Sequence, residues 1–386
     1  MKQNSVFPTL SKQYLFQEIQ TRRDAFQATN PEKKLLFLGI GDTTQPLAPS
    51  IVKSLIQTTQ ELGTAEKYVG YGPEVGEKQL REKIATVIYH NDFSSDEIFI
   101  SDGVNSDLLR LMLLLEEGVS VAIQDPTYPA YFDTARIAKD ANISFLSITD
   151  GPPDLTKAPE GSLVFLCSPN NPTGEAFTHA QYEKMVSIAL ARKLFIILDV
   201  AYREFIRGDF PKSIYEIEGA KKVAIEVGSF SKSSGFSGVR LGWSVVPKEL
   251  CYENGSPAHS DFHRLFTAVF NGASILSQRA GLQILSPEGE KEITTQIDSY
   301  LEQAQLLREA LRAKSFSVVG GDQAPYIWVK MENKTSWEGF DYFLKNLGIV
   351  VTPGIGFGPA GEGFIRLSGL ARPEVISEAI SRIQAM

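Results

Sequence analysis

A regular alternation of short apolar runs with helical patterns is the feature that most constrains the fold of this chain. The run 194–198, Leu-Phe-Ile-Ile-Leu, is apolar at every position, as expected for a strand covered by helices on both faces. The alternation predicts a mostly parallel α/β sheet flanked by helices. The apolar runs are 97–100, 119–123, 163–167, 194–198 and 223–227, and the helical patterns between them include 104–115, 128–138 and 178–191.

The pattern changes after about residue 258, where long helical segments are followed by further strands. At 386 residues, the chain is long enough for two or three domains of roughly 150 residues. We predict a large domain over residues 46–265 and a smaller, discontinuous α+β domain built from 1–45 and 266–386. The elements expected in the smaller domain are helices near 11–25, 273–284, 288–313 and 372–384 and strands 35–39, 316–319, 326–329, 349–352 and 363–367.

Charge and composition exclude several kinds of partner. The 38 basic and 46 acidic side chains give a net charge of −8, so the basic surface of a general nucleic-acid binder is not expected. No apolar run approaches the ~18 residues of a membrane-spanning helix. Cys167 and Cys251 are too few for a disulfide framework, which favours a reducing compartment, the cytoplasm. We therefore expect small-molecule substrates.

Polar segments follow five of the predicted strands. Ligands of open parallel sheets bind beyond the carboxyl ends of the strands, so these segments are expected to surround one crevice. Their side chains include a carboxylate, an amine, two phenols, an amide and several hydroxyls. The segments are 101–103, 125–128, 168–174, 199–202 and 229–232.

These side chains are the components of a pyridoxal phosphate site. Lys232 is the candidate to form a Schiff base with the aldehyde of the cofactor. Asp199 ends the most apolar strand, where a buried carboxylate can keep the pyridine nitrogen protonated. The remaining candidates are Asn171 and Tyr202 for the ring hydroxyl, Tyr128 for stacking on the ring, and the helix start 103–105 with Ser229, Ser231 and Arg240 for the phosphate.

Each of these motifs taken alone has an ordinary structural explanation. Lys232 could be a solvated side chain, Asp199 a helix cap and the Asn-Pro-Thr-Gly sequence at 171–174 a plain turn. Their occurrence in order at successive strand ends favours the cofactor site. Two other motifs are set aside. The Gly-x-Gly-x-x-Gly at 356–361 lacks a strand–loop–helix context, and His259 and His263 lack a third metal ligand.

Longer segments of the chain resemble the fold type I aminotransferases, and among them the LL-diaminopimelate aminotransferases. The resemblance extends over residues 14–366. The strings Gly-Asp-Thr-Thr-Gln-Pro at 41–46 and Phe-Asn-Gly-Ala-Ser at 270–274 are its most specific parts, whereas Asn-Pro-Thr-Gly and Ser-x-Ser-Lys mark the wider superfamily. Other matching segments are 39–40, 70–74, 124–129, 167–174, 229–243 and 364–368.

The resemblance implies a homodimer whose active sites are shared across the interface, with Lys232, Asp199 and Tyr128 as catalytic residues. It further implies that Tyr71 and Asn271 come from the other subunit, as does Glu74, and that Arg366 binds the α-carboxylate of the substrate. The implied cofactor contacts are Tyr71, Val104, Asn105, Tyr128, Asn171, Asp199, Tyr202, Ser229, Ser231, Lys232, Arg240 and Asn271. The implied substrate contacts are Tyr14, Gly41, Glu74, Asn105, Tyr128, Asn171, Asn271 and Arg366.

The activity implied is pyridoxal phosphate-dependent transamination of LL-2,6-diaminopimelate with 2-oxoglutarate, giving tetrahydrodipicolinate and glutamate for lysine and cell-wall synthesis. One position departs from the family pattern, because Val104-Asn105 stands where these enzymes usually carry Ala-Lys. This departure leaves open an aminotransferase acting on lysine or another amino acid. A third possibility, the effector module of a transcription regulator, would require a basic DNA-binding domain, and the 38 residues before the first motif are too few for one.

Overall fold

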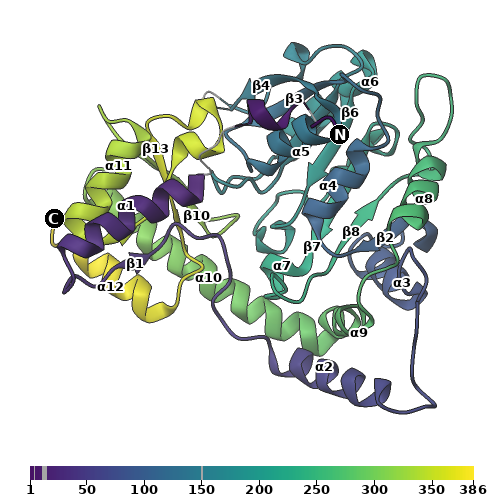
Figure 1. Ribbon diagram of the computed structural model, residues 1–386, viewed down its shortest axis with the longest axis horizontal. Helices are drawn as coiled ribbons and strands as arrows, with labels where there is room; N and C mark the ends of the chain where they lie inside the picture. Colours follow the sequence, from purple (N-terminus) through teal and green to yellow (C-terminus); the bar gives the residue numbers. More distant parts are fainter. Residues whose placement is uncertain (4, 11–14, 149–150) are drawn as a thin grey trace.

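A seven-stranded sheet forms the centre of the larger part of the molecule (Figure 1). In the computed structural model, which describes residues 1–3, 5–10, 15–148 and 151–386, the strand order is β2-β8-β7-β6-β5-β3-β4. Strand β8 is antiparallel to both of its neighbours and all other pairs are parallel, so the predicted mostly parallel sheet is confirmed. The strands are β2 (Ile98–Ser101), β3 (Ser120–Asp125), β4 (Asn142–Ser147), β5 (Leu163–Cys167), β6 (Phe195–Asp199), β7 (Ala224–Ser229) and β8 (Gly242–Val245).

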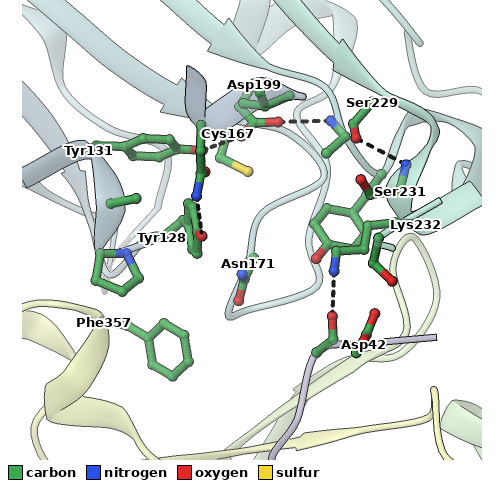
Figure 2. A pocket seen from close by; sticks show the side chains of 18 of the residues that line it. Asp42, Tyr128, Tyr131, Cys167, Asn171, Asp199, Ser229, Ser231, Lys232 and Phe357 are labelled. Atoms are coloured by element: carbon green, nitrogen blue, oxygen red, sulfur yellow. Dashed lines mark hydrogen bonds between the residues drawn. The ribbon is translucent and has the colours of Figure 1, made fainter. Parts of the chain in front are cut away.

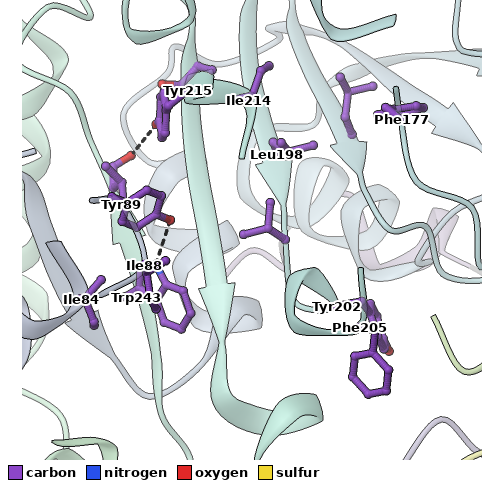
Figure 3. Packing of buried hydrophobic residues seen from close by; sticks show 14 of the residues in the cluster. Ile84, Ile88, Tyr89, Phe177, Leu198, Tyr202, Phe205, Ile214, Tyr215 and Trp243 are labelled. Atoms are coloured by element: carbon purple, nitrogen blue, oxygen red, sulfur yellow. Dashed lines mark hydrogen bonds between the residues drawn. The ribbon is translucent and has the colours of Figure 1, made fainter. Parts of the chain in front are cut away.

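Both faces of this sheet are buried, as the apolar runs predict. On β6, Ile196 and Leu198 belong to one apolar cluster with Trp243, whereas Ile197 belongs to a second cluster on the opposite face. Figure 3 shows part of the first cluster, with Tyr89 beside Trp243 and Leu198 further along the sheet. A strand with one polar face could not occupy this central position without burying polar side chains.

Helices connect and cover the strands. The capping box of α6, in which Thr178 and Gln181 bond reciprocally, shows how a local signal sets a helix start. The sequence patterns did not identify α2, α3 or α8, strands β4 and β8, or the later helix α11 (Ser336–Tyr342). The helices of this part are α2 (Pro49–Leu62), α3 (Lys78–Val87), α4 (Val104–Met112), α5 (Ala130–Lys139), α6 (His179–Arg192), α7 (Phe230–Ser233), α8 (Ala258–Val269) and α9 (Ile275–Ile284).

A second core lies around a four-stranded antiparallel sheet of order β12-β13-β10-β9. A short parallel pair, β1 with β11, brings residues 36–37 from the N-terminal part of the chain to this core. The strand expected at 349–352 is instead divided between two sheets. The elements are β1 (Leu36–Phe37), β9 (Val318–Gly320), β10 (Tyr326–Lys330), β11 (Ile349–Val350), β12 (Thr352–Pro353), β13 (Phe364–Ser368), α1 (Leu15–Thr29), α11 (Ser336–Tyr342) and α12 (Pro373–Gln384).

Helix α10 (Pro287–Ala313) runs from α9 to the smaller sheets (Figure 1). Its first half, including Ile293 and Ile297, packs in a cluster of the large sheet, and its second half, including Leu307 and Leu311, packs in the second core. The division into 46–265 and a discontinuous remainder stays a prediction. In the part of the chain that the structure describes, no helix is long and apolar enough to cross a membrane.

Candidate active site

A cavity of about 440 Å³ lies at the carboxyl ends of the large sheet, where side chains from both cores meet. Segments following β3, β5, β6 and β7 contribute to it, together with the start of α4 and Arg366 of β13. The structure thus places strand ends that are distant in sequence around one space. The cavity-lining residues that the sequence singled out are Gly41, Val104, Asn105, Tyr128, Asn171, Asp199, Tyr202, Ser229, Ser231, Lys232, Arg240 and Arg366.

Lys232 lies in α7, the short helix that begins directly after β7. Its Nζ donates a hydrogen bond of 2.7 Å to the carbonyl oxygen of Gly41. Burial lowers the pKa of the lysine, and the neighbouring carboxylate of Asp42 opposes that shift. A lowered pKa increases the fraction of neutral amine, which is the nucleophilic form.

Asp199 ends β6 inside the cavity and is only 6% exposed. Its Oδ2 accepts a hydrogen bond of 2.8 Å from the hydroxyl of Tyr131, and its Oδ1 accepts one of 2.9 Å from the amide of Ala201. Figure 2 shows Asp199 and Tyr131 on one side of the cavity and Lys232 with Asp42 on another. Burial raises the pKa of Asp199 to about 6 because these two donors do not fully replace water.

Asn171 and Tyr202 also lie in the cavity wall, and both are engaged within the protein. The hydroxyl of Tyr202 lies 2.5 Å from that of Tyr326, and both rings are buried. Asn171 follows β5, and its Oδ1 accepts a hydrogen bond of 2.5 Å from Nη1 of Arg366. The amide nitrogen of Asn171 can offer a donor to a bound group, as can whichever of the two phenols accepts in their mutual hydrogen bond.

A cradle suited to an anion forms where α4 and α7 begin. Gly103 precedes α4 with φ of +123°, and a Cβ atom there would lie 2.3 Å from Nη2 of Arg240. Ser229 caps α7 by accepting the amide of Ser231 at 3.0 Å, and Nη1 of Arg240 lies 3.4 Å from the Ser231 hydroxyl. Two hydroxyls, a guanidinium and the N-terminus of a nine-residue helix thus converge.

Arg366 is a buried cation, and its hydrogen-bond acceptors among the described residues are neutral oxygens and not carboxylates. Its Nη2 donates to the Gly39 carbonyl at 2.6 Å, and its Nε is buried without a hydrogen-bond partner. The guanidinium carbon lies 4.4 Å from the ring centre of Tyr326 and 4.7 Å from that of Phe357. Burial lowers its pKa, which reflects the cost of an unpaired charge that an incoming carboxylate would offset.

Tyr128 and Asn105 both line the cavity and contact each other. Nδ2 of Asn105 donates to the hydroxyl of Tyr128 at 3.3 Å, and Asn105 is exposed. The ring of Tyr128 meets that of Tyr131 edge-on at 5.7 Å. A flat ligand beneath Tyr128 would therefore lie within reach of Asp199.

Three of the sequence-derived site residues that the structure describes do not line this cavity. Tyr71 is 90% exposed, and Glu74 and Asn271 are also exposed on the surface of the chain. Tyr14 lies outside the residues that the structure describes. The placement of the three exposed residues at an active site stays a prediction that requires a second subunit.

Several lining residues carried no usable sequence signal. Tyr131 lies in a helix whose pattern reads as ordinary core, although it bonds Asp199. Tyr326 begins β10 of the four-stranded sheet and Phe357 lies in the turns before β13, so both reach the site only through tertiary packing. Asp42 lies beside the Gly41 contact of Lys232 and could have been suspected from the Gly-Asp-Thr-Thr-Gln-Pro string alone.

The two motifs set aside have other surroundings. Residues 356–361 form two 3₁₀ turns that lead into β13, without the helix of a dinucleotide site. His259 lies against the ring of Phe99, and its Nε2 is 2.8 Å from the Asp96 carbonyl oxygen. Among the described residues, no group of three or more possible metal ligands was found.

The fold and this site define a class of protein that sequence comparison identifies directly: the chain belongs to the aminotransferase class I and II family, which it matches over residues 33–383. It is an enzyme of that class. It is 42% identical to an LL-diaminopimelate aminotransferase of Protochlamydia amoebophila, covering 100% of this chain and 97% of that protein. It is 44% identical to one of Chlamydia pneumoniae, covering 99% and 97%.

A solved structure also matches this chain over its full length. The L,L-diaminopimelate aminotransferase of Chlamydomonas reinhardtii is 45% identical, with a TM-score of 0.94, covering 100% of this chain and 98% of that one. Both the sequence and the fold therefore match across the whole length, and the mostly parallel large sheet with its smaller partner is the architecture of this family.

Proposed function

We propose that this chain catalyses the transamination of LL-2,6-diaminopimelate with 2-oxoglutarate, giving tetrahydrodipicolinate and glutamate, with pyridoxal 5′-phosphate as cofactor. The observation that carries the proposal is the convergence of Lys232, Asp199 and Arg366 on one cavity. The full-length relatives named as LL-diaminopimelate aminotransferases support the substrate.

The residues present fit pyridoxal phosphate. Gly103 leaves free the space that a Cβ would fill beside Arg240, as a site for a phosphate requires. The donors Ser229, Ser231 and Arg240 would hold the phosphate, Asp199 the pyridinium nitrogen and Tyr202 with Asn171 the ring oxygen. Bound through Lys232, the cofactor would supply the electron sink that stabilises a carbanion at the α-carbon of an amino acid.

The protein side of the reaction follows from the geometry. Lys232 is the only lysine lining the cavity among the described residues, so its Nζ is the group that removes the proton from the substrate Cα. Burial favours its neutral form, which is the form able to accept that proton. Tyr131 and Ala201 both donate to Asp199, which stabilises the charged carboxylate that would pair with a pyridinium.

Arg366 would orient the amino acid by its α-carboxylate. Its two engaged nitrogens fix the plane of the guanidinium, and its unpartnered Nε marks unsatisfied donor capacity. Bidentate binding of a carboxylate by a planar guanidinium sets both the position and the rotation of the substrate. The Cα–H bond would thereby be presented to Lys232.

We further propose a homodimer in which Tyr71, Glu74 and Asn271 of one subunit complete the site of the other. Their exposure on the isolated chain supports this arrangement, because each is a large or polar side chain available for contact. The free cysteines Cys167 and Cys251 fit the reducing conditions of the cytoplasm.

A second candidate function is transamination of lysine or a similar amino acid. Its only basis is Asn105, which lines the cavity at the position where the family that the sequence resembles usually carries a lysine. The cofactor and the roles of Lys232, Asp199 and Arg366 are the same in both functions.

The deciding experiment is a half-reaction without keto acid. Protein reconstituted with pyridoxal phosphate is mixed separately with LL-diaminopimelate, the meso isomer, L-lysine and L-glutamate, and the visible cofactor band is followed. We expect LL-diaminopimelate to bleach the band much faster than lysine does, and Lys232→Ala to show neither the band nor turnover. Faster bleaching by lysine would favour the second candidate, and a protein with no cofactor band would exclude both.

A further inference from the structure

Asp125 is a buried carboxylate that the proposed chemistry does not use. It ends β3 and is only 3% exposed. Its Oδ2 accepts a hydrogen bond of 3.0 Å from the amide of Ala360, whereas its Oδ1 has no hydrogen-bond partner. No cation pairs with Asp125 in the described ranges. Burial raises the pKa of Asp125 to about 6, against which the Ala360 amide is the single opposing contact. A buried carboxylate with so little compensation costs stability, which suggests that its position serves another purpose.

The segment that Asp125 contacts, residues 354–361, connects β12 to β13 of the four-stranded sheet. Two hydrogen bonds join it to the end of β3. Besides the Ala360 contact, the amide of Thr127 donates to the carbonyl oxygen of Phe357 at 2.8 Å. Gly358 has a φ of +123°, and a Cβ there would lie 2.1 Å from Oδ1 of Asp125. The loop therefore closes directly over the carboxylate, and a glycine is required for that approach.

Phe357 is itself one of these two attachment points through its carbonyl oxygen, and its side chain lines the cavity. It is buried, its ring lies 4.7 Å from the guanidinium carbon of Arg366, and it meets Trp328 edge-on at 5.8 Å. Figure 2 shows Phe357 on the side of the cavity away from Lys232. A ring in contact with a guanidinium restricts the orientation of that cation.

We propose that Asp125 is a positioning residue: by holding the 354–361 loop against the end of β3, it fixes Phe357 and thereby the orientation in which Arg366 receives the substrate carboxylate. This inference rests on the proposed role of Arg366. The Gly-x-Gly-x-x-Gly sequence of this loop thus has a mechanical function, because its glycines permit the close packing over Asp125 and between Gly354 and Gly361.

Steady-state kinetics of the cofactor-loaded enzyme test the consequence for substrate. Asp125→Ala removes the acceptor of the Ala360 amide, and Asp125→Asn retains one acceptor. We expect the KM for the amino donor to rise at least tenfold in Asp125→Ala and less in Asp125→Asn, with kcat changed by less than about threefold. A raised KM with kcat nearly unchanged means that the substrate is bound more weakly in the ground state and in the transition state by the same amount. An unchanged KM, or a fall in kcat with KM constant, would overturn the proposal.

The matched control is Glu362→Gln. Glu362 lies next to the same loop and its Oε1 accepts the amide of Ser336 at 2.9 Å, so it joins the loop to the smaller core and not to β3. We expect its KM to equal that of the wild type. Equal increases in KM for Glu362→Gln and Asp125→Asn would indicate a general disturbance of the loop and contradict a specific role for Asp125.

Two further variants address folding and the coupling through Phe357. If Asp125→Ala does not fold, Gly358→Ala disturbs the same contact from the loop side and should raise KM similarly. In Asp125→Asn/Phe357→Leu, the increase in KM should be no larger than in Phe357→Leu alone, because both act through one ring. Additive increases would contradict this coupling.

Amide hydrogen exchange of the holoenzyme measures the loop itself without any amino acid. We expect faster exchange in peptides covering 354–361 in Asp125→Asn than in wild type. Unchanged exchange would refute the contact whether or not LL-diaminopimelate is the substrate. Failure of the proposed function would instead show as a wild-type enzyme that transaminates no diaminopimelate, with the exchange difference retained.

Discussion

The hydroxyl of Tyr131 lies 2.8 Å from Oδ2 of Asp199, and both side chains are buried. The ring of Tyr131 is held in a stack on Phe165, with 5.2 Å between the ring centres and 8° between the planes. The donor is therefore fixed in place before any ligand binds. A carboxylate stabilised in this way can remain charged opposite a pyridinium, although burial raises its pKa.

Removing this one donor should weaken the cofactor site. In Tyr131→Phe the stack is kept, but Asp199 retains only the Ala201 amide. Because a hydrogen bond to a charged group contributes about 1.5–3 kcal/mol, we expect kcat/KM to fall about tenfold to 100-fold and the cofactor dissociation constant to rise. Tyr215→Phe is the control, since its buried hydroxyl donates to backbone carbonyls outside the cavity. Equal kinetics for the two variants would contradict the role of Tyr131.

The pKa of Asp199 predicts a pH dependence of stability in the cofactor-free protein. The folded-state pKa of about 6 lies above the ordinary value of 3.8, so ionisation is easier in the unfolded chain. The contribution of Asp199 to stability is thus present below about pH 4 and is lost as the pH rises through 6. Asp107 and Asp125, also raised to about 6, act in the same direction.

Asp199→Asn should therefore stabilise the cofactor-free fold at pH 7.5 by roughly 1–3 kcal/mol, and much less at pH 4.5. Urea unfolding of wild type and variant at both pH values measures the difference. The same substitution should weaken cofactor binding, because the neutral amide cannot pair with a pyridinium. If the variant were equally destabilised at both pH values, burial would not be the cause of a raised pKa at Asp199.

Gly103→Ala tests the proposed phosphate cradle. The new Cβ would lie 2.3 Å from Nη2 of Arg240, and the backbone φ of +123° disfavours any side chain. We expect the displaced guanidinium to lower cofactor affinity about tenfold to 100-fold, measured by fluorescence titration of the apoenzyme. Gly118→Ala is a matched control with φ of +71° and open space around its Cβ position. If Gly118→Ala lowered cofactor affinity as much as Gly103→Ala does, the loss could not be assigned to the displaced Arg240 guanidinium.

Asn105→Lys tests the origin of substrate preference. The exposed Asn105 lines the cavity beside Tyr128, so a lysine there could reach a distal carboxylate. A charge-assisted hydrogen bond of about 1.5–3 kcal/mol should raise the preference for LL-diaminopimelate over L-lysine by tenfold or more. Competition assays with both amino acids measure the ratio. Asn105→Gln, which adds length without charge, should leave the ratio near its wild-type value. If Asn105→Gln changed the ratio as much as Asn105→Lys does, side-chain size and not charge would be the cause.

The sequence was most informative where local pattern and burial coincide. The run 163–167 matches β5 in both bounds, and 194–198 differs from β6 by one residue, because continuous apolar runs occur where helices cover both faces of a strand. By contrast, β4 was not identified, since Asn142–Ser147 lies at the sheet edge, where only Leu146 is buried and polar residues interrupt the apolar ones. Strand β8, Gly242–Val245, is too short to stand out from its surroundings.

The sequence alone determined the kind of chemistry, because strand order brings Lys232, Asp199 and the intervening polar segments to one edge of a parallel sheet. Only the tertiary structure decided what surrounds them. Tyr131 reaches Asp199 through helix packing, and Phe357 reaches Arg366 through a loop fixed to Asp125, more than 200 residues away in the chain. Such contacts depend on side-chain directions and on the docking of two cores, and no local pattern in a sequence encodes either.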